Sequence, residues 1–394
     1  MKKLAIPFRK MAKLLLSGTP RKFLKLLSPL SAAPGKKPKK IYSVKFKIPR
    51  VQQIKPIPVT RLTSRLTARF TVPATSANKT RAKTSPVPDT WPYRSIADPL
   101  VPAGGEFLTK SYTNLAGTRS YKLYIPGDIP VHCDDRHPMI VMLHGCTQSP
   151  DDFSIGTGMN AIACEQRCYV VYPAQSLAAN RHRCWNWFKK INQLHGKGEP
   201  SIIAGITREV IQHYPIDASR VYIAGLSAGG AMAATMSHLY PELYAAVGIH
   251  SGLPHAAATS MPSALSAMSS GIYAPDIDIF RLESSSARPV IVFHGDQDRM
   301  VNPANGDQLI ARSIPKNNSS SLKKGKVPRG HHYTTTSYKN QQGQSVAEYW
   351  QIHGAGHAWA GGNESGSYTD PLGPDASGEM MRFFLSRQLT PAER

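Results

Sequence analysis

One serine in this chain stands in a setting that activates serine hydroxyls for catalysis. Ser227 is the centre of the pattern Gly-Leu-Ser-Ala-Gly over residues 225–229. In a G-x-S-x-G motif, a sharp turn between a strand and a helix lifts the serine hydroxyl to the N-terminus of the helix, where negative charge is stabilised. The alternative is an ordinary turn rich in small residues. Because a hydroxyl is a weak nucleophile, catalysis also requires a base, and an acid that orients the base.

Downstream of Ser227, two aspartates and two histidines compete for these two roles. Asp296 and Asp298 share one segment, and His353 and His357 share a later one. This order of serine, carboxylate and histidine is the order that α/β-hydrolases use. We favour Asp298 as the acid and His357 as the base. We expect Asp296 and His353 to be structural loop residues.

An attack by Ser227 on an ester would create an oxyanion, which needs hydrogen-bond donors that already point at it. The amide of Ala228 directly follows the nucleophile and is one candidate donor. The second donor is expected from an early loop between a strand and a helix. Here that loop is His-Gly-Cys-Thr-Gln over 144–148, and the amide of Cys146 is the candidate.

The elements that would position these residues alternate between strand-like and helix-like patterns. Alternating polar and apolar residues on both sides of Asn114–Gly117 predict a β-hairpin. Apolar runs typical of buried strands cover 139–145, 168–173, 221–224, 245–252, 289–298 and 347–354, and helical patterns cover 158–168, 202–211 and 379–388. A Ser-, Asn- and Lys-rich insert covers 313–330. Strands that alternate with helices predict an α/β fold with a mostly parallel central sheet and helices on both faces.

The positive charge of the chain is concentrated in its first 90 residues. The net charge is +23, of which residues 1–90 carry +21. We therefore expect a basic, Pro-, Ser- and Thr-rich N-terminal arm over 1–103, largely disordered, and a catalytic domain over 104–390. Lysines and arginines among the leucines of the arm predict contact with an anionic surface, and a solvated tail is the alternative. No apolar run reaches the roughly 18 residues of a transmembrane span, and no motif predicts a specific nucleic-acid site.

The cysteines do not form a pattern that binds metal. The chain has five cysteines and no C-x-x-C pair: Cys133, Cys146, Cys164, Cys168 and Cys184. No histidines accompany them at the spacing of a zinc site. We therefore expect no metal and no cofactor.

Several blocks of sequence resemble the poly(3-hydroxybutyrate) depolymerase-type esterases, which are α/β-hydrolases. The blocks occur in the same order over about residues 106–388 and read LHGCTQSPDDF, CWNWF, GEPSIIAGI, VYIAGLSAGGAMAA, GIHSGLP, FHGDQD and HGAGHAWAGG followed by SYTDPLGPDAS. The resemblance implies that Ser227 is the nucleophile, Asp298 the acid and His357 the base. Asp296 falls on a variable position of the family pattern. The basic arm has no counterpart in these blocks.

The resemblance implies a serine esterase that acts on poly(3-hydroxybutyrate), on a similar short-chain polyhydroxyalkanoate, or on its oligomers. A feruloyl or acetyl-xylan esterase is the alternative within the same superfamily. An alternative of another class is a non-catalytic protein that binds polyanions or granules through its basic arm. The resemblance favours export from the cell, whereas the N-terminus favours the cytoplasm because Arg9, Lys10 and Lys13 interrupt what would be the apolar part of a signal peptide.

The same blocks suggest how the walls of the site are built. Cys146 and Cys184 each fall in one of them, and a disulfide between these residues would tie the oxyanion loop to the segment of Trp185 and Trp187. Two buried thiols are the alternative. We expect Trp185 and Trp187 in the core, and Trp359 in an acyl groove because it lies two residues after the expected base.

Overall fold

The computed structural model describes residues 100–102, 104–127, 129, 135–271, 288–314 and 318–393. Nearly all of the predicted arm over 1–103 lies outside the described residues, as does Cys133. The disorder of the arm and the domain boundary near residue 103 therefore stay predictions. Among the residues that the structure describes, no helix is both long enough and apolar enough to cross a membrane.

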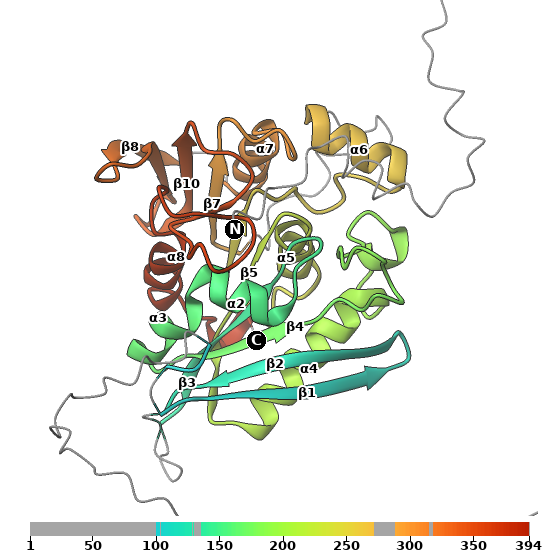
Figure 1. Ribbon diagram of the computed structural model, residues 1–394. Coiled ribbons are helices and arrows are strands. Elements are labelled where there is room, and N and C mark those ends of the chain that lie inside the picture. The colour runs from blue at the N-terminus through green and yellow to red at the C-terminus, as the bar shows by residue number, and fades with distance from the viewer. Residues whose placement is uncertain are drawn as a thin grey trace, which may run out of the picture. The chain divides into compact units, whose positions relative to one another are not determined.

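A ten-stranded sheet forms the centre of the described part of the chain (Figure 1). In spatial order its strands are β1 (Glu106–Asn114), β2 (Gly117–Ile125), β4 (Tyr169–Pro173), β3 (His137–Leu143), β5 (Ile216–Leu226), β6 (Ala246–His250), β7 (Val290–Gly295), β10 (Ser345–His353), β9 (His332–Lys339) and β8 (Ser319–Lys326). The six strands from β4 to β10 are parallel to one another. The strands outside them at both edges pair antiparallel. The prediction of a mostly parallel central sheet is confirmed, as is the hairpin of β1 and β2.

Helices cover both faces of the sheet because the buried strands send apolar side chains alternately to each side. In β3, Val141 and Leu143 belong to one core, whereas Ile140 and Met142 belong to the other. The helices that contribute to the first core are α4 (Gly198–His213), α5 (Ala228–Leu239), α6 (Met261–Ser270) and α7 (Ala304–Ser313). Those of the second core are α2 (Pro150–Thr157), α3 (Met159–Glu165) and α8 (Ala376–Leu385) (Figure 1).

The sheet extends further at the β8 edge than the sequence indicates. The segment 313–330, which reads as an insert, contains β8, and this strand pairs antiparallel with β9 from Ser319↔Lys339 to Lys326↔His332. Seven of the eight residues of β8 are exposed. Because neither face of β8 packs on a core, its sequence carries no apolar alternation that would mark it as a strand. Lysines on such an edge strand also disfavour pairing with another chain.

The parallel strands bring the segments with catalytic residue types to one edge of the sheet. β3 ends at Leu143, β5 at Leu226, β7 at Gly295 and β10 at His353. Since parallel strands share a direction, their carboxyl ends lie at the same edge, where α/β folds bind their ligands. The loops that hold Ser227 and its predicted partners therefore meet there.

Candidate active site

Ser227 lies between β5 and α5 in a backbone conformation that few residues other than glycine adopt. Its φ and ψ are 58° and −118°, and such strain is concentrated at functional sites. A Cβ on Gly225 would lie 2.4 Å from the carbonyl carbon of Gly229, and a Cβ on Gly229 would lie 2.0 Å from the carbonyl oxygen of Leu143. The amide of Ser227 donates to the carbonyl of His250 at 2.9 Å. The turn thus has the geometry that the motif predicts, and its glycines are needed for it.

Asp298 and His357 form a buried pair. Nδ1 of His357 lies 2.7 Å from Oδ2 of Asp298, and the two side chains are 6% and 0% exposed. The other carboxylate oxygen, Oδ1, accepts hydrogen bonds from the amides of Met300 at 2.8 Å and Val301 at 2.9 Å. The carboxylate is therefore held from both sides, and it fixes the ring of His357 with Nδ1 toward the acid. Nε2 of His357 is left for another partner.

The surroundings of Asp298 keep its carboxyl ionised. Burial by itself would raise the pKa of Asp298, but the neighbouring His357 and His294 outweigh it and hold this pKa well below its usual range. Nε2 of His294 lies 3.4 Å from Oδ2 of Asp298 and 2.9 Å from the carbonyl oxygen of Val301. An ionised carboxylate in this position can stabilise a protonated His357.

The competing residues, Asp296 and His353, form a second pair nearer the solvent. Nδ1 of His353 lies 3.1 Å from Oδ2 of Asp296, and the side chains are 45% and 42% exposed. Oδ1 of Asp296 accepts from the amide of Gly354 at 2.8 Å, and Nε2 of His353 is 2.9 Å from Oγ1 of Thr334. Both nitrogens of His353 thus have partners. In the part of the chain that the structure describes, no three His, Cys, Asp or Glu side chains are grouped as a metal ion would require.

Ser227 and His357 line the same small cavity. The full lining consists of Gly145, Cys146, Gln148, Leu226, Ser227, His357 and Tyr368. The structure therefore brings together the three residues that the sequence analysis favours, and it turns Asp296 and His353 toward each other instead. Their catalytic roles stay predictions.

The amides of Cys146 and Ala228 have no acceptor within the described residues. Ala228 is the first residue of α5, a position at which a helix amide has no partner within the helix. The amides on either side of Cys146 are both used: that of Gly145 donates at 2.8 Å and that of Thr147 at 2.6 Å. Cys146 lines the cavity and Ala228 directly follows Ser227, so both amides are available as donors beside the hydroxyl.

The loop that carries Cys146 is anchored from two directions. A disulfide joins Cys146 to Cys184. At the start of the loop, Nε2 of His144 accepts a hydrogen bond from the amide of Gln175 at 3.1 Å, and burial lowers the pKa of His144 to about 4, so the ring remains a neutral acceptor. Nε2 of Gln175 in turn donates to the carbonyl of Cys184 at 3.0 Å. The oxyanion loop and the Cys184 segment are therefore held as one unit.

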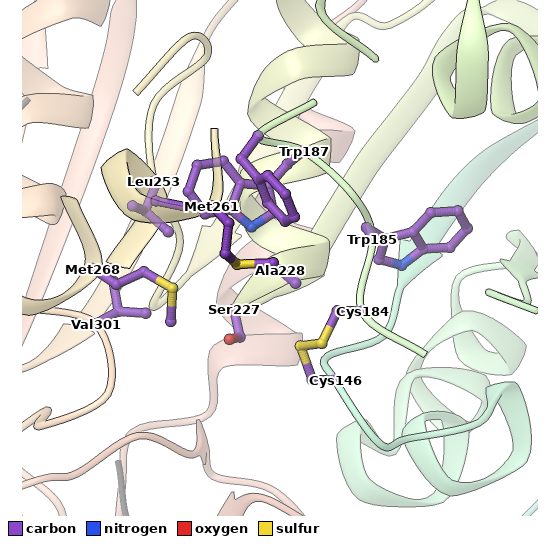
Figure 2. Close-up of a pocket in the computed structure, with 12 residues that line it drawn as sticks. Cys146, Cys184, Trp185, Trp187, Ser227, Ala228, Leu253, Met261, Met268 and Val301 are labelled. Atoms are coloured by element: carbon purple, nitrogen blue, oxygen red, sulfur yellow. A yellow bond between two sulfur atoms is a disulfide. The ribbon is translucent and has the colours of Figure 1, made fainter. Parts of the chain in front are cut away.

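A second, apolar cavity also borders Ser227 (Figure 2). Figure 2 shows Ser227 with the disulfide on one side and Met268 and Val301 on the other, and with Trp187 and Met261 above it. The lining consists of Cys146, Cys184, Trp185, Trp187, Phe188, Ser227, Ala228, Leu253, Met261, Ala264, Met268 and Val301. Except for the hydroxyl of Ser227, these side chains suit an apolar group.

The prediction that Trp359 lies in an acyl groove is wrong. Trp359 is 1% exposed, stacks on the ring of His250 at 5.2 Å between centroids, and donates from Nε1 to Oγ of Ser377 at 3.0 Å. It belongs to the core and lines neither cavity, because its indole nitrogen donates to Ser377 in α8. Trp185 and Trp187 are buried in the core, as predicted, and they also form part of the wall of the apolar cavity.

Sequence reasoning does not single out two further residues of the site, Gln148 and Tyr368. Gln148 accepts the amide of Gly145 at 2.8 Å and donates to the carbonyl of Ser367 at 2.9 Å, which braces the oxyanion loop. Tyr368 lines the cavity of Ser227. The available signal was their place in the blocks LHGCTQSPDDF and SYTDPLGPDAS, since neither residue type points to this chemistry by itself.

Known proteins share sequence with a large part of the chain. A family model described as "Esterase PHB depolymerase" matches residues 119–321, just over half of the chain. Poly(3-hydroxyalkanoate) depolymerase C of Paucimonas lemoignei is 32% identical over 257 residues, 62% of this chain and 59% of that protein. Feruloyl esterase B of Neurospora crassa is 31% identical over 158 residues, 40% of this chain and 51% of that protein.

Another curated relative, the poly(3-hydroxybutyrate) depolymerase of Ralstonia pickettii, is 23% identical over 263 residues, 63% of this chain and 53% of that protein. The chain thus spans between 51% and 59% of the length of these three relatives. Among solved structures, an acetyl xylan esterase from Aspergillus awamori has a TM-score of 0.50 at 19% identity, over 64% of this chain and 93% of that one. This likeness confirms the predicted α/β-hydrolase fold.

Proposed function

The chain belongs to the esterase family described as "Esterase PHB depolymerase", and from this membership we propose that it hydrolyses carboxylic esters through an acyl-enzyme on Ser227. One observation carries the proposal. The buried pair of Asp298 and His357, 2.7 Å apart, borders the cavity that the strained Ser227 also lines. A nucleophile, a base and an orienting acid are the parts that acyl transfer by serine requires.

In the proposed reaction, Oγ of Ser227 attacks the ester carbonyl while Nε2 of His357 takes its proton. The ionised Asp298 holds the ring and stabilises the imidazolium that forms. The amides of Cys146 and Ala228 donate to the oxyanion, and the N-terminus of α5 adds its dipole. The proton then passes from His357 to the leaving alcohol. A water molecule, activated by the same histidine, attacks the acyl-enzyme and releases the acid.

We propose as substrate a polyester of short 3-hydroxyacyl units, or its oligomers. Two of the relatives above are depolymerases of such polyesters by name, and the apolar cavity beside Ser227 suits a short acyl chain. The feruloyl esterase among the relatives keeps a carbohydrate esterase as the second candidate. Turnover of 3-hydroxybutyrate oligomers, methyl ferulate and acetylated xylan by the purified chain, measured side by side, separates the two.

Ester hydrolysis itself is tested with p-nitrophenyl butyrate. We expect turnover that a serine-directed phosphonate abolishes, and a loss of several orders of magnitude in kcat in Ser227→Ala. Ser237→Ala is the matched control, since Ser237 is a buried serine of α5 that lines neither cavity. If Ser227→Ala keeps more than about a few per cent of wild-type kcat, Ser227 is not the nucleophile.

We also propose that the basic arm holds the protein on anionic surfaces. The support is the charge of +21 on residues 1–90, which lie outside the described residues. Full-length protein should be retained on anionic vesicles at low salt and released at high salt, and a variant that lacks residues 1–99 should not be retained. Retention of the shortened variant at low salt would contradict this proposal and leave the esterase proposal untouched.

A further inference from the structure

The two cavities beside Ser227 differ in what they offer to the two halves of an ester. The apolar cavity contains neither His357 nor another ionisable side chain, whereas the other cavity contains His357. If His357 is the base, as proposed above, it must return its proton to the oxygen of the leaving alcohol. The alcohol half of the ester therefore lies on the His357 side, and the acyl half enters the apolar cavity.

Tyr368 stands on the alcohol side in a loop with a defined conformation. The loop is closed by a short parallel pair, β11 (Trp359–Ala360) with β12 (Thr369–Asp370). The carbonyl of Tyr368 accepts a hydrogen bond from the amide of Trp359 at 2.7 Å. The φ of Tyr368 is 55°, a value that is rare for a residue with a side chain. Such strain persists where the surroundings enforce it and is concentrated at functional sites.

The loop is also fastened to the oxyanion side of the site. The carbonyl of Ser367 accepts from Nε2 of Gln148 at 2.9 Å, and the amide of Ser367 donates to Oδ1 of Asp152 at 3.1 Å. On its other side, the amide of Asn363 donates to the carbonyl of Gly156 in α2 at 2.9 Å. The loop of Tyr368 is thus fastened both to the oxyanion loop and to α2, and a substrate contact requires such fixed positioning.

The hydroxyl of Tyr368 can donate its hydrogen bond to a substrate instead of to Thr147. Oγ1 of Thr147 lies 2.6 Å from the carbonyl oxygen of Cys146 and 3.2 Å from the hydroxyl of Tyr368. A hydroxyl has one hydrogen, and that of Thr147 goes to the carbonyl, so Tyr368 is the donor in the second contact. At 3.2 Å this bond is longer than the usual length of about 2.7–2.8 Å between two oxygens. A carbonyl oxygen of a substrate could replace Thr147 as the acceptor.

We infer that Tyr368 donates a hydrogen bond to a carbonyl oxygen in the alcohol half of the substrate. In a polyester of 3-hydroxyacyl units, the leaving alcohol carries the carbonyl of the next ester group. Two carbon atoms lie between the alcohol oxygen and this carbonyl carbon. A simple alkyl alcohol has no such acceptor. Tyr368 therefore selects esters whose alcohol is itself a hydroxyacyl ester, in keeping with the proposed polyester substrate on which this inference rests.

The test compares two butyrate esters that share their acyl half. One is methyl 3-(butanoyloxy)butanoate, whose alcohol carries the carbonyl, and the other is sec-butyl butyrate, whose alcohol has a similar branch without it. We expect Tyr368→Phe to lower kcat/KM for the first ester about three- to tenfold more than for the second, which is the size of one hydrogen bond. Tyr112→Phe is the matched control, because Tyr112 is a partly buried tyrosine that lines neither cavity.

Thr147→Val separates a substrate contact from a structural role. This change removes the partner of Tyr368 within the protein and keeps the phenol, so it should not reproduce the change in selectivity. An equal loss for both esters in Tyr368→Phe, or the same selectivity change in Thr147→Val, would overturn the inference. Wild-type protein that hydrolyses p-nitrophenyl butyrate but neither of these two esters would overturn the proposed polyester substrate together with the inference. If the wild-type protein is active but Tyr368→Phe leaves the selectivity between the two esters unchanged, only the role of Tyr368 is overturned.

Discussion

The same two segments of the chain build two Asp–His pairs with different surroundings. Asp298 and His357 are 2.7 Å apart and almost fully buried, whereas Asp296 and His353 are 3.1 Å apart and nearly half exposed. The two aspartates are two positions apart in the sequence, and the two histidines are four positions apart. Residue type therefore does not distinguish the pairs, but burial and the remaining hydrogen-bond partners do.

The difference shows what turns such a pair into a catalytic one. Charges attract more strongly in a buried environment than in water, and the amides of Met300 and Val301 hold the buried carboxylate without competing for His357. In the exposed pair, Nε2 of His353 already has Thr334 as its partner. Only the buried pair presents a histidine nitrogen to the cavity of Ser227. The comparison predicts that changes to the two pairs have effects of very different size.

The largest difference is expected between the two histidines. His357→Ala should lower kcat on p-nitrophenyl butyrate by about 10⁴–10⁶-fold, since no other side chain would take the proton of Ser227. His353→Ala should change kcat by less than about threefold, the scale of a change outside the catalytic constellation. Steady-state kinetics on both purified variants measure this. Comparable losses of kcat in the two variants would show that the catalytic role is not confined to the pair of Asp298 and His357, as we propose.

The aspartates should repeat this pattern on a smaller scale. Asp298→Asn should lower kcat by about 10³–10⁴-fold, because an amide neither fixes the required tautomer of His357 nor stabilises its charge. Asp296→Asn keeps an acceptor for the amide of Gly354 and should stay within about twofold of wild type. A larger loss in Asp296→Asn than in Asp298→Asn would reverse the assignment of the acid.

The buried carboxylate should also make stability depend on pH. The pKa of Asp298 is lower in the fold than the value of about 3.9 for an unfolded chain. Its ionised form therefore stabilises the fold above about pH 4, and this stabilisation is lost as the pH falls through the folded pKa. Urea unfolding of wild type and Asp298→Asn should differ by about 1–3 kcal/mol at pH 7. The difference should shrink steadily below about pH 4, and a difference that grows there would contradict the assigned direction of the shift.

The sequence was sufficient for the parts of the site that follow from strand order. Ser227, Asp298 and His357 each follow the carboxyl end of a parallel strand, so the apolar runs before them placed them at one edge. The direction of a side chain within a loop has no such signature. Trp359 lies two residues after His357, yet the pairing of β11 with β12 is accompanied by an indole that points into the core. Proximity along the chain therefore gave the wrong wall for the cavity.

Elements without an apolar face were also beyond sequence reasoning. The exposed side chains of β8 leave no alternation to detect, although the strand completes one edge of the sheet. Tyr368 reaches the cavity only because its loop folds over α2 and contacts the oxyanion loop. Contacts of this kind join segments more than 200 residues apart, and local pattern cannot predict them.

The smallest expected effect concerns the stability that the exposed pair contributes. Burial would raise the pKa of Asp296, but the amide of Gly354 and the ring of His353 outweigh it and lower this pKa, so the carboxylate is ionised at neutral pH. Both side chains of the pair contact water, so solvent screens the attraction between the Asp296 carboxylate and the His353 ring when the ring is protonated. Asp296→Asn should therefore reduce the free energy of unfolding by less than about 1 kcal/mol.

This small effect should also disappear in salt, which separates attraction between charges from a hydrogen bond. At about 1 M NaCl the screening length falls to roughly 3 Å, so wild type and Asp296→Asn should unfold at the same urea concentration. Asp298→Asn, measured in parallel, should keep its difference from wild type because its pair is shielded from solvent ions. If salt removed both differences, or neither, burial would not be what distinguishes the two pairs.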